Sequence, residues 1–161
     1  MRIHLMWASA TLALVIAGCG SPTSATPAAS PTPTCLNASA KHHAYVVVQH
    51  LSGASLQACV GFDGDTISGT DLFSRSRVEY QTAVTSFGPG VCQVDNEPAQ
   101  FSTCFPQNQP YWSLWLETSG AWSMAQVGFD KTTFHDHDAM GWHYVQPTDP
   151  SPAPPPAAHQ S

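Results

Sequence analysis

The alternation of apolar and polar residues predicts a strand-rich domain over residues 41–146. Residues 45–48 read Tyr-Val-Val-Val, a short β-branched run that is typical of a buried strand. In residues 57–62 the apolar side chains share one face and Cys59 points to the other. With a turn at 51–54 between them, these two runs predict a hairpin.

The period changes once, after a turn at residues 64–65. Ser68 is a good N-cap, and Asp71 three residues later makes a variant of the capping box. This pattern predicts one short helix that ends near Arg77. The side chains expected to face a sheet are Leu72, Phe73 and Ser76.

A period of two then resumes and continues to residue 145. A break is expected at 88–90 and a turn at 95–98, where Pro and Gly or Asp and Asn cluster. Two strands, a helix and then several strands indicate an α+β fold, with the helix on a mixed sheet. A β-grasp arrangement is one of a few options for it. The later strands are expected over residues 80–87, 91–94, 111–117, 121–127, 132–134 and 140–145.

Aromatic residues concentrate on three of these later strands. Alternation places about half of them on a core face, where they need no further role. The others could form a stacking surface for a planar or sugar-like ligand. The candidate ligand-binding residues are Tyr111, Trp112, Trp115, Trp122, Trp142 and Tyr144.

The two ends of the chain have a different composition. A charged start, a short apolar run and small residues before Cys19 predict a lipoprotein signal peptide over 1–18, with lipid attached to Cys19. Residues 19–40 are read as the lipidated cysteine and a Pro/Ser/Thr/Ala linker. Residues 147–161 are read as a disordered Pro-rich tail. The expected location is therefore the extracytoplasmic face of a membrane.

The odd number of cysteines fits this expected location. If Cys19 carries lipid, four of the five cysteines remain, enough for two disulfides in an oxidising compartment. Cys92 and Cys104 enclose a short loop with a turn, and a bridge there would contribute about 3 kcal/mol. Cys59 paired with either of these two is the alternative. Cys35 with Cys59 is the default for the remaining pair.

Charge excludes some functions. The formal net charge is −6 with five basic residues, which lacks the basic footprint that nucleic acid or anionic headgroups require. No nucleophile motif such as G-x-S-x-G or S-x-x-K is present, and the acidic residues are scattered at turns. The chain is therefore expected not to be an enzyme, and no cofactor is predicted.

The histidines invite a metal interpretation. His135 and His137 are two apart, and His42, His43 and His50 could add ligands. A structural zinc site needs four ligands at defined spacing, whereas His135 and His137 fall in an expected turn. We therefore predict no metal site.

Five segments follow one another along the chain, over residues 64–71, 91–95, 111–115, 120–122 and 138–144. In this order they resemble bacterial secreted relatives of the transcobalamin C-terminal domain. The resemblance spans about residues 44–146. It implies a β-grasp-like fold among domains that bind soluble ligands, with a corrinoid as the suggested ligand. The chain lacks the helical domain that holds most of the corrinoid in transcobalamins, and its turn before the last strand has His137 where the family often has Gly.

These observations favour a membrane-anchored extracytoplasmic lipoprotein with a non-catalytic module for a small soluble ligand. The alternative is an envelope module with a structural or protein-interaction role.

Overall fold

The computed structural model describes residues 34–159, which lie within one compact unit of the chain. The expected signal peptide (residues 1–18), Cys19 and the linker as far as residue 33 lie outside the described residues. Within the described range, no helix is long and apolar enough to cross a bilayer.

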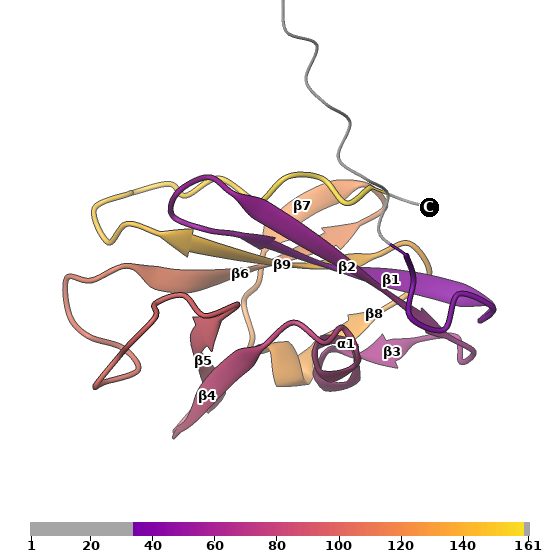
Figure 1. The fold of residues 1–161 in the computed structure, drawn as a ribbon, viewed down its shortest axis with the longest axis horizontal. Coiled ribbons are helices and arrows are strands. Elements are labelled where there is room, and N and C mark those ends of the chain that lie inside the picture. The colour runs from indigo at the N-terminus through magenta and orange to yellow at the C-terminus, as the bar shows by residue number, and fades with distance from the viewer. Residues whose placement is uncertain (1–33, 160–161) are drawn as a thin grey trace, which may run out of the picture. The chain divides into compact units, whose positions relative to one another are not determined.

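A five-stranded sheet forms the centre of the domain, in the order β2-β1-β9-β6-β7. The central strand β9 runs parallel to its neighbour β1, and every other neighbouring pair is antiparallel. The expectation of an α+β fold with a mixed sheet is thus confirmed (Figure 1). The strands are β1 (His42–Gln49), β2 (Ser55–Phe62), β6 (Tyr111–Thr118), β7 (Ala121–Met124) and β9 (Ala139–Val145).

The remaining elements lie against one face of this sheet, which we call the inner face (Figure 1). Two short ladders join β3 to β8 and β4 to β5. The elements are β3 (Ile67–Ser68), α1 (Gly69–Arg75), β4 (Tyr80–Thr85), β5 (Gly88–Val94), the 3-10 helix η1 (Phe129–Lys131) and β8 (Thr133–Phe134).

Helix α1 forms where the change of period predicts it. The Asp71 amide donates to the Ser68 hydroxyl (3.1 Å), which in turn donates to the Asp71 carboxylate (2.9 Å). This satisfies an amide that the first turn would leave unpaired. Leu72 and Phe73 are fully buried against the sheet, and the Phe73 ring stacks on Tyr80 with centroids 3.9 Å apart.

Several strand boundaries differ from the expected ones, among them the start of β5 and the end of β7. Residues 88–90, expected to break the chain, begin β5, because a tight turn folds β5 back onto β4. Gly88 adopts a φ of 113°, which favours glycine, and the Thr85 hydroxyl donates to its carbonyl (2.7 Å). β7 ends at Met124, short of the expected residue 127.

The segment before β1 closes one edge of the sheet. Cys35 forms a disulfide with Cys59, the pair that was the default expectation. Leu36 pairs with β2: its amide donates to the Cys59 carbonyl (2.9 Å), and its carbonyl accepts from the Gly61 amide (2.7 Å). The folded unit therefore begins before residue 41, the boundary that composition suggested.

The Pro-rich tail differs most from its prediction. Residues 147–161 were expected to be disordered, but residues 147–159 cross the face of the sheet opposite α1, which we call the outer face (Figure 1). Pro155 is buried there, and Ala158 packs on a cluster that includes Tyr45 and Cys59. The prediction of disorder rested on the lack of large apolar side chains in this tail, whereas the outer face accepts small ones.

Candidate functional site

A cavity of about 270 Å³ lies between the loop of residues 95–110 and the start of β6. Residues from β5, this loop and the beginning of β6 line it, together with Tyr144 of β9. It is therefore built where the loop closed by the second disulfide meets the central sheet.

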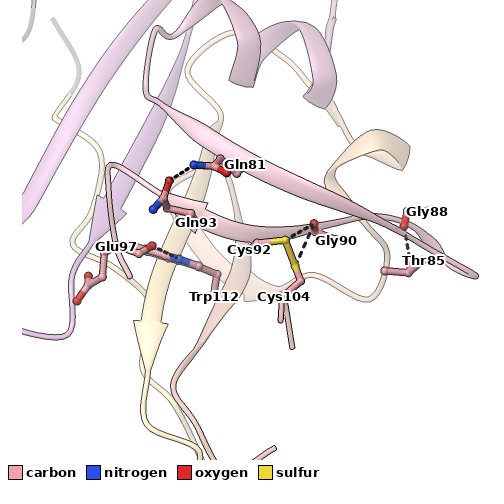
Figure 2. Close-up of a disulfide and its surroundings, with 9 residues drawn as sticks. All are labelled: Gln81, Thr85, Gly88, Gly90, Cys92, Gln93, Glu97, Cys104 and Trp112. Carbon is pink, nitrogen blue, oxygen red and sulfur yellow. Dashed lines mark hydrogen bonds between the residues drawn. A yellow bond between two sulfur atoms is a disulfide. The ribbon is translucent and has the colours of Figure 1, made fainter. Parts of the chain in front are cut away.

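The loop is fixed at its first turn and at Cys104. Cys92 and Cys104 form the expected disulfide, and both sulfur atoms lie 3.8 Å from the Gly90 carbonyl oxygen (Figure 2). Val94 and Glu97 exchange two backbone hydrogen bonds across the turn that Asp95 and Asn96 form with positive φ. The turn chemistry predicted for residues 95–98 is present, and its Glu97–Pro98 peptide is cis.

Side chains from the sheet hold this turn in place. The Trp112 indole donates to the Glu97 carbonyl (2.9 Å), as Figure 2 shows. The two ring nitrogens of His50 contact different carboxylates, Nδ1 that of Glu97 (2.7 Å) and Nε2 that of Asp95 (3.1 Å). Carboxylates accept hydrogen bonds, so a His50 ring nitrogen that carries a proton donates to the carboxylate it contacts. The turn is thereby tied to the end of β1.

Two aromatic rings form the sheet side of the cavity. The Trp112 and Tyr144 rings contact each other with centroids 4.8 Å apart. Burial, followed by the charge of Glu97, raises the pKa of the Tyr144 phenol above its ordinary value of 10.0. The phenol therefore stays a neutral hydrogen-bond donor over a wider pH range than a free tyrosine.

Loop residues supply the opposite side. Phe101 and Phe105 line the cavity and are 37% and 52% exposed. The Phe105 ring lies over Gly90 so closely that a Cβ at this position would overlap it. A glycine in the middle of β5 therefore lets the loop approach the strand.

The chemistry of the lining is uncharged. Among its residues, all of which the structure describes, none is Asp, Glu, Lys, Arg or His. Aromatic rings and prolines alternate with amide and hydroxyl groups, the latter from Gln100, Ser102, Thr103 and Gln109. Such a surface can stack on a flat or ring-shaped neutral group and exchange hydrogen bonds with its edge.

The six predicted aromatic residues separate into three groups. Tyr111, Trp112 and Tyr144 line the cavity. Trp142 is buried on the inner face, where its ring stacks on Phe73 with centroids 5.4 Å apart. Trp115 and Trp122 lie on the outer face, because they pair across β6, β9 and β7 with residues of that face.

Phe101, Phe105 and the other loop residues were not among the site residues predicted from the sequence. The available signal was two phenylalanines in a segment rich in Gln, Ser, Thr and Pro, close to Cys104. Large apolar side chains in a polar loop need a surface to pack on. Here the disulfide holds the loop against β5, where Phe105 lies over Gly90.

Four of the five histidines that were considered as metal ligands lie away from the cavity, around the turn of residues 135–138 and the start of β1. His42 Nδ1 and His137 Nε2 approach Asp136 Oδ2 (3.6 and 3.4 Å), and His135 Nδ1 approaches Asp138 Oδ2 (3.5 Å). Within residues 34–159, no three His, Cys, Asp or Glu side chains are placed to hold a metal ion.

Asp136 is nevertheless perturbed. The amide of His43 donates to its carboxylate (2.8 Å), and this bond, helped by His137 and His42 and opposed by burial, lowers its pKa below 3.8. The carboxylate therefore acts as an anchor between the turn at 135–138 and the start of β1.

Comparison with known proteins shows only a likeness of fold. No family model matches the chain, and no curated protein matches it. The chain is similar to a solved structure from Ruminococcus gnavus ATCC 29149 described as a "putative metal binding protein". The TM-score is 0.50 at 17% identity, over 66% of this chain and 98% of the other.

Proposed function

We propose that this chain is an extracytoplasmic lipoprotein, anchored through lipid on Cys19, that binds a small neutral ligand without catalysis. The observation that carries the proposal is the uncharged aromatic cavity beside the bridged loop. Two disulfides are in keeping with an oxidising compartment outside the cytoplasm.

We also propose a β-grasp arrangement, in keeping with the resemblance to transcobalamin C-terminal relatives. The order β2-β1-β9-β6-β7, with β9 parallel to β1 and a helix on one face, supports it. The cavity lies beside the start of β6 and the end of β9, at one end of this sheet.

The size of the cavity limits the ligand. Pockets that bury a whole drug-sized ligand measure about 300–1,000 Å³, and this one is just below that range. It suits a single ring or sugar unit and is too small to enclose a corrinoid macrocycle, which could contact it only by an edge. The structural neighbour is described as a metal-binding protein, but the described residues of this chain hold no group of three His, Cys, Asp or Glu side chains that could bind a metal ion.

A binding screen tests the proposal. The secreted Cys19→Ala chain is screened by thermal shift against neutral saccharides, aromatic amides, corrinoids, haem and divalent metal ions. A neutral ring compound is expected to raise the melting temperature and to change the tryptophan fluorescence, since Trp112 lines the cavity.

Two phenylalanine variants make the test specific. Phe101→Ala removes a cavity wall and is expected to weaken binding roughly 2- to 10-fold, the value of one aromatic contact. Phe87→Ala is the matched control, because Phe87 is 92% exposed and does not line the cavity. Equal losses in the two variants, or no compound that shifts the melting temperature, would contradict the proposal.

One observation favours the alternative of a protein-interaction module. Val84 and Phe87, at the tip of the β4–β5 hairpin, are 98% and 92% exposed. Exposed apolar groups of this size are found at protein contacts. If this role holds, Phe87→Ala abolishes co-purification of an envelope partner and Phe101→Ala does not.

A further inference from the structure

The C-terminal segment follows a furrow in the outer face. In the middle of the sheet, β9 presents Ala139, Gly141 and His143 to this face, on alternate positions. The first two are the smallest residues available, so the middle of the face is low. Large side chains of the flanking strands form the two sides of the furrow: Tyr45 of β1 on one side, and Trp115 of β6 and Trp122 of β7 on the other.

The segment fits this furrow closely at one proline. A Cβ added to Gly141 would lie 2.6 Å from Pro155 Cγ and 2.6 Å from Trp122 Cζ3. Real Cβ contacts are not this short, so the Pro155 ring occupies the space that a side chain would need. Pro155 is buried, whereas its neighbours Pro154 and Pro156 are exposed.

Side chains of the sheet bind the backbone of the segment at three points. His143 Nδ1 donates to the Ala153 carbonyl (2.7 Å). The Ala158 amide donates to the buried carboxylate of Glu117 (3.1 Å). The Gln57 side-chain amide both donates to the His159 carbonyl (2.7 Å) and accepts from its amide (2.8 Å).

These contacts have a consistent direction and spacing. Ala153 meets His143, Pro155 meets Gly141, and Ala158 meets Glu117, which pairs with Ala139. The segment therefore runs antiparallel to β9. Four residues of strand advance about 13 Å and five of an extended Pro-rich chain about 15 Å, so the two match.

We propose that the outer face is a second binding site, for an extended peptide, and that residues 153–159 are its resident ligand. The site takes a proline over Gly141 and a small residue three positions later, with its amide on Glu117. It contacts the ligand through side chains, because in the described part of the chain no backbone–backbone hydrogen bond joins 150–159 to a strand. Recognition of extended Pro-rich segments beside aromatic rings is a known mode of peptide binding.

Exchange of the segment tests this. Residues 148–151 are exposed, and a protease recognition sequence placed there allows the folded full-length chain to be cut. A fluorescent peptide of residues 150–159 is then added. The cut chain is expected to bind it. The uncut chain is not, since the tethered segment has a millimolar effective concentration.

Two adjacent prolines supply a matched pair of peptides. Replacement of Pro155 by Ala removes a buried ring and is expected to weaken binding about tenfold. Replacement of Pro154 by Ala removes the same backbone restraint from an exposed position, and the change is expected to stay within about twofold. Equal effects of the two replacements would overturn the proposed site.

A measurement on the intact chain covers the case in which cutting unfolds the domain. Hydrogen exchange should show that the amides of Ala158 and His159 are protected, since both donate to side chains of the sheet. Gln57→Ala should remove the protection of His159. Exchange of both amides at unfolded-chain rates in the uncut protein would overturn the proposal.

Discussion

Tyr144 shows how one residue of the cavity reports on its surroundings. Burial and the charge of Glu97 raise its pKa above 10.0, so the folded chain retains a proton that the unfolded chain loses first. The free energy of unfolding should therefore be unaffected by this group below pH 10 and should fall as the pH rises from 10 through the folded pKa. Absorbance at 295 nm and urea unfolding at pH 8 and 11 measure it. Tyr144→Phe should lose less stability over this interval, and an equal loss would contradict the assignment.

The pKa of Asp136 is shifted in the opposite direction. Its pKa is lowered, chiefly by the His43 amide, so its contribution is present above its ordinary value of 3.8 and is lost as the pH falls through the folded value. Asp136→Asn keeps an oxygen acceptor but loses the charge. We expect this variant to be less stable than the wild type at pH 7, and the difference to shrink as the pH falls through the folded pKa, as measured by denaturant unfolding. A stability difference that does not change with pH would assign the effect to packing.

Among the elements, the bridged loop matters most for the cavity. Replacing Cys92 and Cys104 together by Ser frees a loop with a sequence separation of 12, which should cost about 3 kcal/mol in unfolding free energy. Ligand affinity should fall as well, because Phe101 and Phe105 lose their support. The double replacement of Cys35 and Cys59 is the matched control. It should destabilise the chain by a similar amount but leave ligand affinity unchanged. Equal ligand affinity in both double variants would show that the bridged loop does not contribute to binding.

The elements also show which parts of the structure the sequence could predict. Ser68 and Asp71 act within four residues, and the alternating faces of 111–117 and 140–145 follow from strand geometry, so local patterns reveal them. Phe101 and Phe105 have no period, and the Pro155 contact depends on Gly141, fourteen positions away and on another element. Such features follow from long-range packing, which propensity and periodicity do not encode. The cavity and the outer-face segment were not predicted for this reason. Three of the six aromatic residues predicted to bind a ligand do line the cavity.

For the molecule as a whole, the proposed lipid anchor decides where the binding sites act. Cys19→Ala should move the chain from the membrane fraction to the soluble extracytoplasmic fraction, because two or more acyl chains are needed for stable attachment. Fractionation with mass spectrometry of the N-terminal peptide measures this. The Cys35→Ser variant serves as the control and should stay with the membrane. A Cys19→Ala chain that remains membrane-bound would place the attachment elsewhere.

The pairing of Leu36 with β2 has a consequence for the behaviour of many copies together. The outer strand of an open sheet presents unpaired amides and carbonyls that can recruit another chain and start aggregation. Here residues 35–40 cover that side of β2: a Cβ at Gly61 would collide with Asn37 and Ala40, and the Cys35–Cys59 bond holds the cover in place. At the opposite side β7 is only four residues long. Reduction of this one bond is thus expected to affect solubility before it affects the fold, by opening a template for intermolecular strand addition.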